Sequence, residues 1–243
     1  MLFRSELYFQ PIVRVKDESL YAAEALLRIH DKNGNFISPA EAIPILEESG
    51  LIIPVGKWII QNAFSMCTEC RKYYPEFRVS INLSYVQILK SPLMMELKQI
   101  IEHSGISCSG IIVELTESGY LEGTPAVRSV WNDMKKLRIQ IALDDFGTGY
   151  SNLMNISNLE PDIVKLDRGF TLKALSRSYE YQLMQYVIEM VHKLNQYVCV
   201  EGVETKEDLE KIKALGPDLI QGYYYSKPCS RDEFLKKFFG YSE

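Results

Sequence analysis

Two hydrophobic patterns alternate along the chain. Short apolar runs, several of them alternating with polar residues, predict strands, and longer segments with apolar residues three and four apart predict helices. The predicted strands span residues 7–14, 20–28, 78–83, 111–116, 139–144, 162–167, 197–201 and 218–221. The predicted helices span residues 39–49, 54–73, 92–104, 124–137, 177–195, 205–214 and 230–238.

This alternation predicts an α/β fold. Eight strands with helices between most of them are typical of a (β/α)8 barrel, and a doubly wound open sheet is the alternative. The first two strands are separated only by residues 16–19, which are too few to form a helix. We therefore expect a hairpin there, with the first strand antiparallel to its neighbour. The sequence has no clear repeat and no long linker, so one domain should span residues 1–243.

Composition narrows the classes of partner. Hydrophobic residues make up 47% of the chain and charged residues 24%, as in an ordinary globular protein, and the net charge is -5. Without a block of Lys and Arg, duplex nucleic acid is not an expected partner. No apolar run reaches transmembrane length and no signal-peptide pattern is present, so we expect no membrane segment. The five cysteines form no disulfide framework, which predicts a reducing, cytoplasmic location.

Acidic residues collect where the predicted strands end. Asp144 and Asp145 follow the apolar run 139–143 and precede a Gly-containing turn. Adjacent carboxylates repel each other there, and a bound divalent cation would offset the repulsion. The carboxyl ends of barrel strands converge on one site. The residues expected to meet at that site are Glu24, Asn82, Glu114, Asp144, Asp145, Lys165, Glu201 and Gln221.

This set predicts a metal site. Five carboxylates cannot share one pocket fully ionised without cations. Oxygen ligands favour Mg²⁺ or Mn²⁺ over zinc, and the number of ligands suits the two-metal arrangement that is used in phosphoryl chemistry. The alternative is that each acid is separately solvated or salt-bridged. Because the pattern repeats in seven strands, we favour a shared site.

The same residues carry a resemblance to a known family. The chain resembles the EAL domain of cyclic di-GMP phosphodiesterases, which is named after the signature found here as Glu24-Ala25-Leu26. The resemblance covers essentially the whole chain, and its specificity lies in the joint order and spacing of the motifs. The matching stretches are residues 8–13, 24–28, 82–84, 114–117, 144–150, 164–167, 201–205, 221–223 and 226–228.

The resemblance implies a barrel with an antiparallel first strand and assigns roles to the convergent residues. Lys165 would orient the attacking water. Glu201 has been assigned as a general base in this family, although we prefer it as a metal ligand because water bound to two metals needs little further activation. The first metal would be bound by Glu24, Asn82, Glu114 and Asp144, and the second by Asp144, Asp145 and Glu201.

Further residues acquire roles from the same resemblance. Arg28 would hold a substrate phosphate, Gln10 a guanine edge, and Gln221 polar contacts near the attacking water. Glu117 would anchor a gating loop over residues 146–153.

Glu204 would support the metal ligands without binding metal itself. Ile29 stands where Trp is common in the family, but no departure of this chain from the family pattern removes a metal ligand.

The sequence therefore predicts a metal-dependent phosphodiesterase, with two Mg²⁺ or Mn²⁺ ions per site, that hydrolyses cyclic di-GMP to linear 5′-pGpG. A non-catalytic cyclic di-GMP binding module is the alternative, which lost acids would favour, and none is lost. A metal-using barrel enzyme that forms an enolate is a third reading. It is disfavoured because no second Lys or His base lies near a strand end. The resemblance also implies a homodimer through helices near the gating loop.

Overall fold

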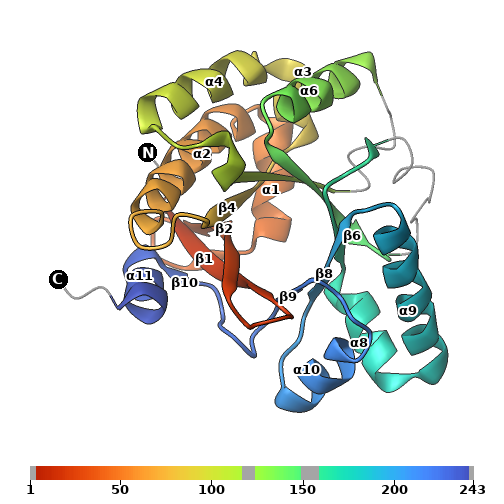
Figure 1. Ribbon diagram of the computed structural model, residues 1–243. Coiled ribbons are helices and arrows are strands. Elements are labelled where there is room, and N and C mark those ends of the chain that lie inside the picture. The colour runs from red at the N-terminus through yellow and green to blue at the C-terminus, as the bar shows by residue number, and fades with distance from the viewer. Residues whose placement is uncertain (1–3, 117–123, 149–158, 241–243) are drawn as a thin grey trace.

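The computed structural model describes residues 4–116, 124–148 and 159–240 and shows a closed barrel of eight strands (Figure 1). Strand β1 pairs antiparallel with β2 on one side and with β9 on the other, and the remaining barrel neighbours pair parallel. The predicted barrel and its antiparallel first strand are confirmed. The barrel strands are β1 (Arg4–Arg14), β2 (Leu20–His30), β4 (Arg78–Asn82), β5 (Ile111–Thr116), β6 (Gln140–Phe146), β7 (Ile163–Leu166), β8 (Tyr197–Glu201) and β9 (Leu219–Gln221).

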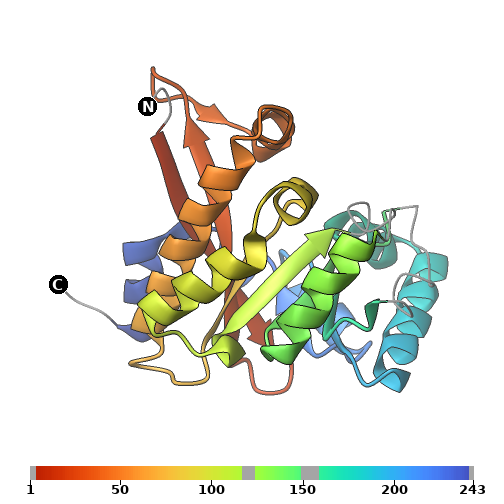
Figure 2. The ribbon, with the colours of Figure 1, turned by 90° about the horizontal axis from the view of Figure 1, so that it is seen from above.

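The β1–β2 hairpin is longer than the other barrel strands, with 11 residues in each arm. Figure 2 shows that it extends past the rest of the barrel. Two short strands that the sequence pattern did not predict pair with it. The strand β3 (Phe36–Ile37) pairs with the end of β2, and β10 (Cys229–Ser230) pairs with Tyr8 and Phe9 of β1. A two-residue strand is too short to give a periodic signal.

Helices surround the barrel (Figure 1). All seven predicted helices are present, and α3 and α8 are additional. The sequence pattern missed α3 because it has only six residues, and it missed α8 because that helix follows β7 with Asp167 as its N-cap and no intervening loop. The helices are α1 (Pro39–Glu48), α2 (Ile52–Cys70), α3 (Tyr85–Lys90), α4 (Leu93–Ser104), α6 (Pro125–Lys136), α8 (Arg168–Ser176), α9 (Ser178–Lys193), α10 (Lys206–Lys213) and α11 (Arg231–Phe239), with a 3₁₀ turn at Cys108–Gly110.

The hydrophobic core of the described residues has two main parts, and a third cluster of Leu27, Ile29, Ala42 and Ile59 packs where β2, α1 and α2 meet. The larger part includes Phe64, Phe77 and Phe234, which are fully buried in the cluster formed by strand and helix side chains. The smaller part is an apolar layer that includes Ile112, Ile163 and other inward-facing strand residues. The side chains of this layer pack across the barrel interior beneath its polar end. No helix in the described ranges is long and apolar enough to cross a membrane.

Candidate active site

Four carboxylates surround one buried ammonium group. The Nζ atom of Lys165 lies 2.7 Å from Glu114 Oε2 and 2.7 Å from Glu201 Oε1. It also lies 3.3 Å from Asp144 Oδ1 and 3.6 Å from Glu24 Oε2. Lys165 is 2% exposed, so water does not screen these contacts. One cation therefore balances several acids in a low-dielectric environment.

Strand register explains why these residues meet. Asn82 on β4 stands beside Glu114 on β5, Glu201 on β8 beside Gln221 on β9, and Gln10 on β1 beside Glu24 on β2. Neighbouring strands therefore place polar side chains at the same height on the inner face. The predicted convergence of polar residues on one end of the barrel is thus visible in the structure.

The carboxylate of Glu24 is held by amide groups as well as by Lys165. Asn82 Nδ2 donates to Glu24 Oε1 at 2.6 Å, and Gln221 Nε2 donates to Glu24 Oε2 at 2.6 Å. Burial tends to raise the pKa of Glu24, but the attraction of Lys165 and the amide hydrogen bonds outweigh it, and the net shift is downward. Glu24 is therefore ionised. Lys165 offsets its negative charge, and the two amides stabilise it by hydrogen bonds.

Gln221 belongs to a short chain of amides. Its Nε2 also donates to Gln10 Oε1 at 3.2 Å, and Gln10 Nε2 donates to the carbonyl oxygen of Ser226 at 3.2 Å. Gln10 is 8% exposed. Both ends of its amide therefore bond to protein groups in this structure, and one of these bonds must be exchanged if Gln10 is to contact a ligand.

Asp145 is exposed beside the cluster, at a backbone irregularity. Strict alternation along β6 places Asp145 on the face opposite to Asp144. However, the register between β6 and β7 shifts between Leu143 and Phe146, and Asp145 adopts a left-handed conformation with φ of 59°. Burial and the charges of Asp144 and Asp167 raise the pKa of Asp145 to about 6. The titration of this carboxyl group therefore depends on its acidic neighbours.

The cluster has more negative than positive charge. Burial, together with repulsion by Asp144 and Glu24, raises the pKa of Glu201 to about 8, more than the attraction of Lys165 lowers it. The pKa of Glu114 is also raised, first by burial and then by the charge of Glu24. Burial tends to lower the pKa of Lys165, but the surrounding acids hold it well above its usual value.

The residues present fit divalent cations. The atoms that would bind a metal are carboxylate and amide oxygens, which suit hard ions such as Mg²⁺ and Mn²⁺. Asp144 Oδ1 is buried and accepts no hydrogen bond from the described residues, and Lys165 is its nearby cation. Among the described side chains no three His, Cys, Asp or Glu residues already form a metal-binding group. The acids instead converge on Lys165, and bound cations would share them with it.

The other predicted residues lie around this cluster. Arg28 is half-buried on β2, beyond Glu24, with its guanidinium 5.4 Å from the centre of the Tyr8 ring. Glu204, in the loop after β8, accepts two hydrogen bonds from Arg168 and does not touch Lys165. Glu117 and residues 149–153 of the predicted gating loop lie outside the described residues.

Three residues near the cluster were missed by the sequence reasoning. The Ser80 hydroxyl donates to Glu114 Oε1, the Ser226 carbonyl accepts from Gln10, and the charge of Asp167 acts on Asp145. Ser80 shares a strand face with Asn82, which is a usable signal. The carbonyl of Ser226 gives no signal in a sequence, because every residue has one.

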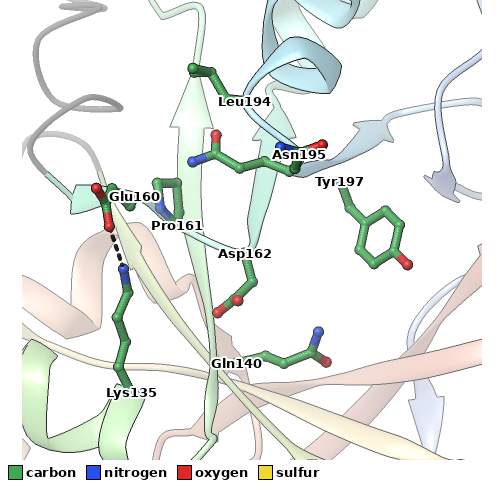
Figure 3. Close-up of a pocket in the computed structure, with 9 residues that line it drawn as sticks. Lys135, Gln140, Glu160, Pro161, Asp162, Leu194, Asn195 and Tyr197 are labelled. Carbon is green, nitrogen blue, oxygen red and sulfur yellow. Dashed lines mark hydrogen bonds and ion pairs between the residues drawn. The ribbon is translucent and has the colours of Figure 1, made fainter.

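A cavity lined by described residues lies elsewhere, near the amino ends of β6, β7 and β8. It measures about 540 Å³ and is lined by polar groups, among which Lys135 and Glu160 form an ion pair at 3.4 Å (Figure 3). Asp162, which also lines it, already accepts the backbone N–H of Ile141 at 2.8 Å. The acids of the cluster are not among the lining residues, so this cavity is not the candidate active site.

A closed barrel with an antiparallel first strand and an acid cluster at one end defines a class of TIM-type barrel protein. Residues 4–228 match the model of the EAL domain family, and the chain belongs to that family. The family resemblance seen in the sequence is therefore confirmed.

Individual relatives agree with this assignment. The cyclic di-GMP phosphodiesterase PdeF of Escherichia coli is 31% identical over 219 residues, which are 90% of this chain and 29% of PdeF. The EAL enzyme Bd1971, solved with cAMP and cyclic di-GMP bound, matches with a TM-score of 0.91 at 31% identity, covering 96% of this chain and 64% of that one. The PaMucR phosphodiesterase in complex with cyclic di-GMP matches with a TM-score of 0.88 at 27% identity, covering 95% and 94%. The chain spans about a third of the length of the curated relatives it matches.

The raised pKa of Glu201 predicts how the stability of the metal-free protein changes with pH. Its folded-state pKa of about 8 exceeds the ordinary value of 4.5. The folded state therefore retains a proton that the unfolded state loses, and Glu201 lowers the free energy of unfolding progressively as pH rises from about 4.5 to about 8. Glutamine mimics the protonated side chain. The Glu201→Gln variant should be more stable than the wild type by on the order of 1–3 kcal/mol at pH 8, and equally stable near pH 4.5.

Urea unfolding in EDTA, followed by tryptophan fluorescence, would measure this difference. The Glu204→Gln variant is the control, because Glu204 lies outside the Lys165 cluster, and it should not reproduce the effect. An advantage of Glu201→Gln that grows toward low pH would contradict the charge balance described here.

Proposed function

We propose that this chain hydrolyses cyclic di-GMP to linear 5′-pGpG. The observation that carries the proposal is the set of four carboxylates around Lys165, with Asp145 next to Asp144, at the end of the barrel where the parallel strands terminate. Active sites of this architecture lie at that end. The family membership and the relatives named as cyclic di-GMP phosphodiesterases supply the substrate.

Charge supports a site for two divalent cations. Cation binding displaces protons from acids with raised pKa values, and five ionised carboxylates against one ammonium group would then leave four negative charges, which two divalent cations would neutralise. Bound there, Mg²⁺ or Mn²⁺ would supply Lewis acidity for a water nucleophile and for the phosphate. Glu24, Asn82, Glu114 and Asp144 would hold one ion, and Asp144, Asp145 and Glu201 would hold the other.

Lys165 has two tasks in this proposal. Without cations it holds the acids together, because it contacts Glu114 and Glu201 at 2.7 Å. Its ammonium group has three N–H donors. Once the acids are shared with cations, a donor is available to orient the attacking water. Glu201, which contacts the same ammonium group, would serve as a ligand of the second ion.

Substrate contacts would come from the rim of the barrel. Arg28 forms no ion pair with a described residue, and its planar fork suits two oxygens of a phosphate. Gln221 would keep polar contacts near the water. Gln10 would exchange its bond to Ser226 for a guanine edge.

A cyclic di-GMP binding module without turnover is the second candidate. The observation that favours it is that Lys165 already occupies the centre of the acids, with no preformed metal-binding group among the described residues. The two functions differ in their products, so one experiment separates them.

Exposed apolar residues on α8 and α9 support a homodimer near the predicted gating loop. They are Leu172, Tyr179, Leu183 and Tyr186, which are 42%, 73%, 43% and 67% exposed. We expect light scattering of the purified chain to give twice the monomer mass. Replacing Tyr179 and Tyr186 by Ser should shift the protein to the monomer, and a mass unchanged by these substitutions would exclude this face.

The central test is incubation with cyclic di-GMP and Mg²⁺ or Mn²⁺, followed by chromatography of the products. We expect pGpG to form, EDTA to abolish its formation, and added Mg²⁺ or Mn²⁺ to restore it. Ca²⁺ should support little turnover because its larger radius and looser geometry position ligands less strictly. The control is Asp144→Asn, which keeps the side-chain shape but removes a shared charge. Binding of cyclic di-GMP without pGpG under all these conditions would establish the binding module instead.

Steady-state kinetics would separate the roles of the two basic side chains, Arg28 and Lys165. Arg28→Lys loses the planar fork, so KM should rise about 10-fold with kcat little changed. Lys165→Met loses the donor to the water, so kcat should fall about 100-fold or more. Arg168→Lys is the matched control, because Arg168 binds Glu204 at the same end of the barrel. An unchanged KM for Arg28→Lys would remove Arg28 from the phosphate site.

A further inference from the structure

Ser80 is a buried polar side chain beside the apolar layer of the barrel. It is fully buried on β4 and stands next to Glu24 on β2 and Ile112 on β5. A small void beneath the acids is lined by Ser80 together with apolar side chains such as Ile112, Ala142 and Ile163. A hydroxyl in such surroundings requires a hydrogen-bond partner. Its partner is the carboxylate of Glu114.

The two oxygens of Glu114 have different donors. Ser80 on β4 donates to Oε1, and Lys165 on β7 donates to Oε2 at 2.7 Å. Glu114 is 1% exposed, so water does not replace either donor. Because the donors come from strands on opposite sides of β5 in the sheet order, they fix the plane of the carboxylate.

We propose that Ser80 is a positioning residue for Glu114, holding its carboxylate in the orientation that a divalent cation requires. The inference rests on the proposed function, in which Glu114 is a metal ligand. Groups that orient metal ligands typically contribute 10–100-fold to metal affinity, although they do not touch the metal.

The void beside Ser80 determines which variants test this. Its volume is about 10 Å³. A cavity needs roughly that volume or more to hold a water molecule, so the space that Ser80→Ala adds could admit one that replaces the hydroxyl. Thr and Val have nearly the same shape, both suit a strand, and they differ in a hydroxyl against a methyl group. Ser80→Thr and Ser80→Val therefore form a matched pair with equal added volume.

The experiment is a titration of the metal-free full chain with Mn²⁺, with free Mn²⁺ followed by electron paramagnetic resonance. We expect Ser80→Val to bind Mn²⁺ 10–100-fold more weakly than Ser80→Thr, and Ser80→Thr to stay near the wild type. Tyr21→Phe is the control for a merely structural effect. It removes another buried hydroxyl, which donates to Gln140 Oε1, and it should lower the melting temperature without changing Mn²⁺ affinity.

Three results would overturn the inference, and they are distinguishable. Equal Mn²⁺ affinity in Ser80→Thr and Ser80→Val, with normal binding by the wild type, would remove Ser80 from the site and leave the proposed function intact. An absence of saturable Mn²⁺ binding in the wild type would overturn the metal site, and the role of Ser80 with it. If Tyr21→Phe weakened Mn²⁺ binding as much as Ser80→Val, the effect would be a general loss of stability.

Discussion

The attraction between one buried ammonium group and the acids around it is the interaction on which this site depends. Lys165 is 2% exposed and contacts acids that come from four different strands. A buried charge without partners would cost several kcal/mol, and so would each buried carboxylate. Their mutual attraction keeps Lys165 charged and Glu24 ionised and holds the groups close together, whereas burial and mutual repulsion raise the pKa values of Glu114 and Glu201. The arrangement is also unbalanced, because the acids outnumber the cation, and that imbalance is what makes additional positive charge favourable there.

The rest of the barrel serves to hold these charges in place. The apolar layer that contains Ile112 and Ile163 closes the barrel beneath the acids and excludes water from below. Amides from β4 and β9 restrain Glu24, while a hydroxyl from β4 restrains Glu114. Glu24 and Glu114 thus have donors that fix their directions. Such preorganisation is what charge stabilisation in an active site requires.

Much of this could be predicted from the sequence. Alternation within strands gave the barrel and the inward-facing acids, because the period of two determines which residues share a face. The short connection at residues 16–19 gave the antiparallel first strand, because chain length alone excludes a crossover there. The metals, the substrate and the individual roles came from the family resemblance and not from the pattern.

The remaining features depend on information that periodicity does not contain. Helix α3 and the strands β3 and β10 are too short for a periodic signal. The backbone at Asp145 departs from regular strand geometry through a register shift and a left-handed conformation, which alternation does not predict. The contact between Ser80 and Glu114 depends on the register between β4 and β5, which no single segment encodes.

The direction of β1 has a consequence for where the chain enters the molecule. In a barrel whose strands are all parallel, the first strand starts at the face opposite to the active site. Here β1 is reversed, and its start at Arg4 pairs with His30 at the far end of β2, beyond Glu24 and Arg28. The polypeptide therefore enters beside the mouth of the barrel. Gln10 lies on this same strand and is linked through the amide of Gln221 to Glu24, so the strand that begins at the mouth of the barrel is also bonded to the acid cluster.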